Sequence, residues 1–97
     1  MMLRPGIRVW MRNKCYRLIF GRVPDDCRAI VDNMKKTIRV SKHVRGKAKL
    51  YVLIHESLHA CHWDLTEEAV EQTGKSISEL LWALGYREEK QNGPTRV

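Results

Sequence analysis

Two histidines four residues apart, with a glutamate directly after the first, are the residues of this 97-residue chain whose types and spacing indicate chemistry. They are His55 and His59, and the glutamate is Glu56. In a helix, residues four apart lie on one face, about one turn from each other, so both imidazoles can bind a single tetrahedral Zn²⁺. Glu56 can then reach a water held by the ion and take its proton as the water attacks a carbonyl carbon. The HExxH pattern therefore predicts a zinc site with Glu56 as general base.

A catalytic zinc ion needs a third protein ligand and an open fourth position. Glu67 is the first choice, because it lies at the edge of the apolar stripe of the following helix, on the side that must face the histidines. Glu68 points further from that stripe and is the second choice. Glu67 can instead be the acid of a capping box whose N-cap is Asp64. The remaining candidates are Cys61, His62, Asp64 and Glu71. Of these, His62 is the next to consider.

The first 41 residues are predicted to form strands. Residues 7–11 and 37–40 alternate apolar and polar side chains, and residues 16–20 and 29–31 are short apolar runs between turn-forming residues. We expect three or four short strands in an antiparallel meander, with a turn at Arg12-Asn13-Lys14. A free edge at residues 37–40, just before the histidines, could pair with an extended peptide substrate.

The pattern then takes the period of a helix. Residues 47–62 are predicted to form the helix that carries the histidines on the side opposite its apolar arc. A second helix follows Trp63, begins at an N-cap Asp64 and ends at Gly85. We interpret Trp63 as a core residue that can alternatively wall the cleft. The apolar stripe expected on the second helix consists of Val70, Thr73, Ile77, Leu80, Leu81 and Leu84.

Size and composition indicate one small folded domain, which we place at residues 1–87, with a polar tail at 88–97. Hydrophobic residues make up 43% of the chain, but the apolar runs are far shorter than the ~20 residues of a membrane span, so we expect no membrane partner. The N-terminus has no apolar segment typical of a secretory signal. The cysteines Cys15, Cys27 and Cys61 form no CxxC pair, which favours a reducing compartment and predicts a cytoplasmic protein.

The charge is divided between the two halves of the chain. Residues 1–49 hold 14 Lys and Arg against 3 Asp and Glu, whereas residues 50–97 hold 4 against 8. A basic half favours an acidic partner, nucleic acid included. The alternative is that these charges, which are spread along the chain, are the solvated faces of strands and loops.

A resemblance to a known family rests on residues 37–87. They read TIRVSKHVRGKAKLYVLIHESLHACHWDLTEEAVEQTGKSISELLWALGYR, with an LIHExxHA helix, an EEAV helix and an LLWxLGY ending. This stretch resembles small, mostly phage or prophage, zincin-like metallopeptidases, which are similar to minimal SprT-like and ImmA/IrrE-like cores. The resemblance implies an α+β zincin core, in which a small antiparallel sheet precedes the HExxH helix and a glutamate helix. It also implies a phage protein in the bacterial cytoplasm, with a gluzincin-type Zn²⁺ site on His55, His59 and Glu67 or Glu68.

Three functions are compatible with these residues. The first is a zinc-dependent metallopeptidase, a hydrolase acting on a peptide or protein substrate with Glu56 as base. The second is a non-catalytic module stabilised by zinc, whose basic N-terminal half contacts a protein or nucleic acid. The third is a regulatory, antirestriction or DNA-processing accessory protein without a metal. The intact Glu56 favours the first, because a purely structural zinc site needs no base beside it. The oligomeric state does not follow from the sequence.

Overall fold

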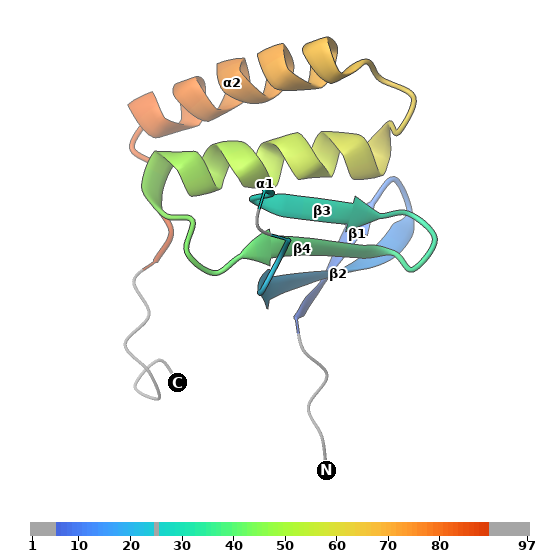
Figure 1. Cartoon of the computed structure of the whole chain (residues 1–97). Helices are drawn as coiled ribbons and strands as arrows, with labels where there is room; N and C mark the ends of the chain where they lie inside the picture. The colour runs from blue at the N-terminus through green and yellow to red at the C-terminus, as the bar shows by residue number, and fades with distance from the viewer. Residues whose placement is uncertain (1–5, 25, 90–97) are drawn as a thin grey trace.

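A computed structural model describes residues 6–24 and 26–89 of the chain. Four strands come first: β1 (Ile7–Met11), β2 (Lys14–Gly21), β3 (Ala29–Asp32) and β4 (Thr37–Ser41). Two helices follow, α1 (Gly46–Cys61) and α2 (Glu67–Ala83) (Figure 1). The fold class is α+β, as predicted, and every predicted strand and helix is present within a few residues of its expected bounds. Most of the predicted tail, residues 90–97, lies outside the described residues.

The sheet is mixed, so the predicted antiparallel meander is wrong. Its strand order is β1-β2-β4-β3; the two outer pairs are antiparallel, but β2 and β4 run parallel. The reason lies in β4, whose Ile38 and Val40 are almost completely buried. A strand with two such side chains is best placed inside the sheet, whereas the four-residue β3 occupies the edge. Strand β3 therefore forms a hairpin on the far side of β4 and does not pair with β2.

The first turn follows from its residues. Arg12 and Asn13 have φ values of 50° and 68°, and they join β1 to β2 as a two-residue hairpin. Consecutive positive φ values give a turn whose twist matches that of the strands, and asparagine tolerates this conformation better than most residues. The predicted turn is confirmed at these two residues, and Lys14 already belongs to β2.

Both helices lie on one side of the sheet (Figure 1). Helix α1 packs against the strands, and α2 packs on α1 alone among the described elements. Helix α1 is thus the middle of three layers. Neither helix is long and apolar enough to cross a lipid bilayer.

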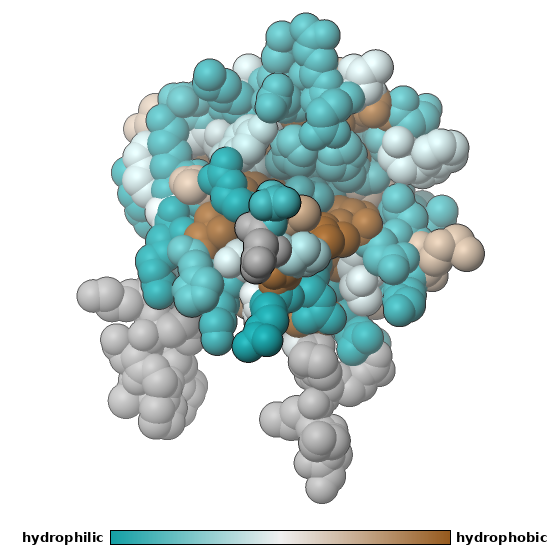
Figure 2. All heavy atoms as spheres, viewed as in Figure 1, coloured by the Kyte–Doolittle hydropathy of each residue, from teal (hydrophilic) through white to brown (hydrophobic). Residues whose placement is uncertain are grey.

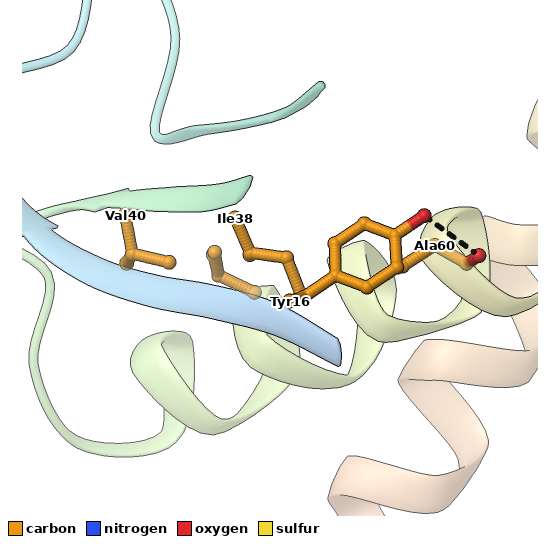
Figure 3. Packing of buried hydrophobic residues seen from close by; sticks show 5 residues of the cluster. Tyr16, Ile38, Val40 and Ala60 are labelled. Carbon is orange, nitrogen blue, oxygen red and sulfur yellow. Dashed lines mark hydrogen bonds between the residues drawn. The ribbon is translucent and has the colours of Figure 1, made fainter. Parts of the chain in front are cut away.

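The core lies between the sheet and α1 (Figure 3). It contains Tyr16, Ile38 and Val40 from the strands and Val52 and Ala60 from α1. The predicted apolar arc of the helix did not include Val52 or Ala60. It consisted of Leu50, Leu53, Ile54, Ser57, Leu58 and Cys61. The difference arises because α1 packs against the sheet on one side and against α2 on another. The row of side chains that faces the sheet is therefore not necessarily the most apolar row of the helix.

Tyr16 connects this core to the end of α1. Its hydroxyl donates to Asn33 Oδ1 at 2.6 Å and lies 3.5 Å from the Ala60 carbonyl oxygen (Figure 3). Burial raises the pKa of the Tyr16 hydroxyl, and Cys61 adds to that rise, so the group stays a protonated donor. The tyrosine therefore anchors the last turn of α1, where His59 lies, to the sheet.

Helix α2 begins and packs differently from the prediction. Its N-cap is Thr66, whose Oγ1 accepts a hydrogen bond from the Ala69 amide at 3.0 Å, so the predicted Asp64 cap is wrong. The His62 carbonyl accepts from the Leu65 amide, which forms a turn around Asp64 before the helix starts. The buried residues of α2 are Val70, Gly74 and Ser78. The predicted stripe is largely outside: the exposed fractions of Ile77, Leu80 and Leu84 are 37%, 58% and 67%.

Small residues let α2 approach α1 closely. A Cβ on Gly74 would lie 3.4 Å from Tyr51 Cε1 and 3.6 Å from His55 Cα. These are ordinary contact distances, so an alanine fits without displacement, but a longer side chain does not. Gly74 therefore sets the separation of the two helices beside the histidines.

Substitution of Gly74 tests this packing. We expect Gly74→Ala to keep the fold and to stabilise it by up to ~1 kcal/mol, because alanine has the higher helix propensity. Gly74→Leu should cost about 1–3 kcal/mol through overpacking. Urea denaturation of the two variants beside the wild type measures both. A Gly74→Leu variant as stable as the wild type would contradict the close approach of the helices.

Candidate metal centre

The two helices bring His55, His59 and Glu67 together. His55 Nε2 lies 3.2 Å from Glu67 Oε2, and His59 Nε2 lies 3.2 Å from Glu67 Oε1. One potential ligand atom from each residue lies within 4.8 Å of the others. The histidine side chains are only 14% and 24% exposed, whereas that of Glu67 is 69% exposed. The cluster therefore opens toward solvent on the glutamate side.

The donor set fits a zinc ion. Bonds of ~2.0–2.1 Å separate the ligand atoms of a tetrahedral site by roughly 3.3 Å. Each histidine nitrogen lies at about this distance from a different oxygen of Glu67, and one ligand atom from each residue lies within 4.8 Å of the other two. Two imidazole nitrogens and one carboxylate also match the ligands of catalytic zinc sites, which keep a fourth position open.

The other candidate ligands lie elsewhere. Glu68 Oε2 accepts from the Gln72 side chain at 3.4 Å, and His62 Nδ1 is 3.3 Å from Arg12 Nη1. The Cys61 thiol is directed at Met11 Sδ at 3.8 Å. Of the residues considered, the structure thus brings Glu67 alone to the histidines. Its alternative role as the acid of a capping box on Asp64 is wrong, because the cap is Thr66.

Tyr51 holds the first histidine in place. Its hydroxyl is 3.1 Å from His55 Nδ1, which leaves Nε2 directed at Glu67. Burial raises the pKa of the Tyr51 hydroxyl, with a further rise from Glu71 and an opposing effect of Arg28, so the phenol stays neutral. We did not single out Tyr51 from the sequence. The signal was present, because it lies four residues before His55 on the same helical row.

Glu56 faces the sheet from α1. It stands between Val52 and Ala60 on one helical row, and both of those residues are in the core. Burial raises the pKa of the Glu56 carboxyl; His55 and His59 oppose that rise, and Glu67 adds to it. A carboxyl in this setting holds a proton more readily than an exposed glutamate, which suits a group that takes and returns protons.

A cleft of about 320 Å³ adjoins the cluster. Besides the histidines, Glu56 and Glu67, it is lined by Asn33, Trp63 and the β3 residues Ala29, Ile30 and Val31. Trp63 is 73% exposed, so its interpretation as a core residue is wrong and it walls the cleft. Figure 2, viewed from the β3 side, shows apolar surface below the polar helices.

The strand edge at the cleft belongs to β3. The prediction that residues 37–40 present a free edge is wrong, because β4 pairs with β2 on one side and β3 on the other. Strand β3 pairs with β4 alone among the described strands, so its other edge is open where its residues line the cleft. No family model, no curated protein and no solved structure matches this chain, and the zincin-like resemblance therefore stays a prediction.

Glu67→Gln and Glu68→Gln form a matched pair that tests the third ligand. Glutamine keeps the length and helix propensity but is a poor anionic ligand. Substituting a residue that only hydrogen-bonds to a metal ligand typically weakens metal affinity ~10–100-fold. We expect Glu67→Gln to weaken zinc affinity by much more than this, and Glu68→Gln to leave it unchanged. Competition with a chromogenic chelator measures both. Loss of zinc by Glu68→Gln alone would contradict the assignment.

Tyr51→Phe tests the support of His55. The variant keeps the ring and loses the hydroxyl partner of Nδ1, so zinc affinity should fall about 10–100-fold while the fold is kept. Tyr86→Phe is the control, since Tyr86 is 62% exposed beyond the end of α2. Equal affinities of the two variants would show that Tyr51 does not position the ligand.

Proposed function

We propose that this chain is a zinc-dependent peptidase in which His55, His59 and Glu67 hold the metal and Glu56 is the general base. The observation that carries the proposal is the position of a half-buried carboxyl beside a three-residue cluster in one cleft. A structural zinc site has four protein ligands and needs no base. In this cleft three ligands and a separate carboxyl meet, which is the set that zinc-assisted hydrolysis requires.

The proposed reaction divides the work between residues of one helix. A zinc ion held by the cluster would supply an activated water, whose pKa it would lower. Glu56 takes a proton from the attacking water and returns it to the leaving amine. His55 and His59, one turn apart on the side of α1 that faces α2, would hold the metal with Glu67, and Glu56 would act on the water from the sheet side.

The open edge of β3 supports a peptide as the substrate class. An extended peptide can pair with an unpaired strand, which holds its backbone straight and leaves its carbonyl groups in fixed positions. Ala29, Ile30 and Val31 lie along such an edge and line the cleft that contains Glu56. Trp63 offers an apolar wall for a substrate side chain in the same cleft.

One observation favours a second candidate, a non-catalytic module stabilised by zinc. Helix α2 packs on α1 alone among the described elements, and two of its three buried residues are Gly74 and Ser78. An ion bound by residues of both α1 and α2 would increase the stability of the interface between the two helices. This role requires His55, His59 and Glu67 but gives no function to Glu56.

Glu56→Gln separates the two functions. It should lower the rate of hydrolysis of a quenched fluorescent peptide pool by roughly 10²–10⁴-fold, because proton transfer in the transition state is lost. Zinc stoichiometry, measured by plasma emission, should stay that of the wild type. Glu68→Gln is the control, with the same change on an exposed residue outside the cluster. A wild type that binds zinc without cleaving any peptide, or Glu56→Gln with full activity, would contradict a peptidase.

A further inference from the structure

The face of the sheet turned away from α1 carries arginines and an exposed tryptophan. Side chains alternate along a strand, and Val9, Tyr16 and Ile38 point to the core. Their neighbours therefore point to the opposite face, which both helices leave uncovered (Figure 1). The outward residues include Arg8 and Trp10 in β1, Arg17 in β2, Arg39 in β4 and Ile30 in β3. Ile19 of β2 belongs to the same face beside Arg39, but its side chain is only 7% exposed, so the accessible part of the face consists of the residues around it.

Two of the arginines stand directly opposite each other. Arg8 pairs with Arg17 in the antiparallel register of β1 and β2, and Arg39 lies one strand further along, diagonal to Arg17. Like charges in directly opposite positions destabilise a sheet. In the part of the chain that the structure describes, no carboxylate forms an ion pair with any of the three. The pair is therefore suited to an anion that comes from outside the chain.

Acidic groups near this face do not neutralise it. Asp32 shares the row of Arg8 and Arg17, but its Oδ1 accepts from the backbone amides of Met34 and Lys35 at 3.0 and 2.9 Å. Asp26 is exposed in the loop before β3. The three arginines outnumber the single carboxylate in these strand rows, so the face has a positive charge overall.

The basic surface continues past the end of the strands. Arg39 Nη1 lies 3.9 Å from the position that a Cβ on Gly21 would take, so its side chain extends toward the last residue of β2. Gly21 also lines a second hollow of about 500 Å³, whose walls include Arg22, Lys42 and His43. This hollow lies at the carboxyl ends of the parallel pair β2 and β4. Cationic side chains thus run from the sheet face into a pocket at its end.

The exposed side chain of Trp10 favours one class of polyanion over the others. It is 67% exposed on the same face, two residues from Arg8 and opposite the half-buried Cys15. An acidic peptide needs cations but no exposed aromatic ring. A single-stranded nucleic acid needs both, because its phosphates pair with cations and its unpaired bases stack on aromatic side chains. A duplex keeps its bases stacked internally and would use the arginines alone.

We propose that the outer face of the sheet binds single-stranded nucleic acid, with Arg8, Arg17 and Arg39 on the phosphates and a base stacked on Trp10. The backbone continues toward Arg22 and Lys42 in the hollow beyond β2. This surface lies on the opposite side of the sheet from α1 and the metal cluster, so the inference goes beyond the proposed function and does not depend on it.

Fluorescence anisotropy with the full chain and labelled oligothymidylate or oligouridylate of about 12 nucleotides tests the proposal. Both probes should bind, and three phosphate contacts predict a slope of about −2 for the logarithm of affinity against that of salt concentration. Arg8→Gln and Arg17→Gln should each reduce that slope by about 0.7. Trp10→Ala should weaken binding at least about fivefold with the slope unchanged, because stacking involves no counterion release.

One control variant removes a positive charge elsewhere in the protein, and a second removes a tryptophan elsewhere. Lys75→Gln removes one cation from α2, and Trp63→Ala removes an equally exposed tryptophan from the cleft of the metal centre. Neither should change binding. Thermal melts check the fold, and Arg8→Gln should not lower Tm, since it removes one of two opposed like charges.

Three results would overturn the proposal. The first is no binding of either oligonucleotide at about 50 mM salt. The second is Arg17→Gln and Trp10→Ala variants that bind like the Lys75→Gln control. The third is equal binding of an oligoglutamate of the same length, which would assign the face to an acidic protein. None of these results affects zinc binding or peptide hydrolysis, so failure here is distinguishable from failure of the peptidase.

Discussion

The site depends on the position of α1 between two other layers. Because the sheet packs against one side of the helix and α2 against another, its side chains divide into rows with different surroundings. Val52, Glu56 and Ala60 form the row toward the sheet, and this places a carboxyl among apolar neighbours. Tyr51, His55 and His59 form the adjacent row, which meets Glu67 on α2. The carboxyl of Glu56 and two of the three clustered side chains thus come from one helix, and Glu67 joins them from α2.

The parts of this arrangement that were predictable from sequence are the local ones. The spacing of His55 and His59, the strand and helix segments and the choice of Glu67 over Glu68 all follow from periodicity along one element. The errors concern contacts between elements. Strand order depends on which strand has a neighbour at each of its two edges, and the cap at Thr66 depends on a turn formed before it. Tyr51 was missed because its only sequence signal is its position one helical turn before His55, a spacing that many residue pairs share.

The uneven charge of the sequence corresponds to layers of the structure. The basic half of the chain forms the sheet, and the acidic residues of the second half are mostly on α2 and around the metal cluster. The arginines on the outer strand face are therefore separated from the carboxylates near the cluster by the sheet and α1 (Figure 1). This separation keeps the two charged surfaces from neutralising each other, because exposed charges more than ~10 Å apart are largely screened in salt. The sequence interpretation of scattered, merely solvated charges did not anticipate that three arginines share one face.

The hydroxyl of Tyr51 is suited to both states of its histidine. With Glu67 3.2 Å from His55 Nε2, the proton is best placed on Nε2, and Nδ1 then accepts a hydrogen bond from the Tyr51 hydroxyl. If His55 bound a metal through Nε2, that nitrogen would carry no proton; the proton would be on Nδ1, which would donate to the same hydroxyl oxygen. A tyrosine can reverse its role by rotating one O–H bond, whereas an ionised carboxylate only accepts and would favour the second state alone. Because burial keeps the phenol protonated, the reversal needs no charge to enter the helix interface. A tyrosine at this position is therefore compatible both with the pairing of His55 and Glu67 and with the metal binding that we propose.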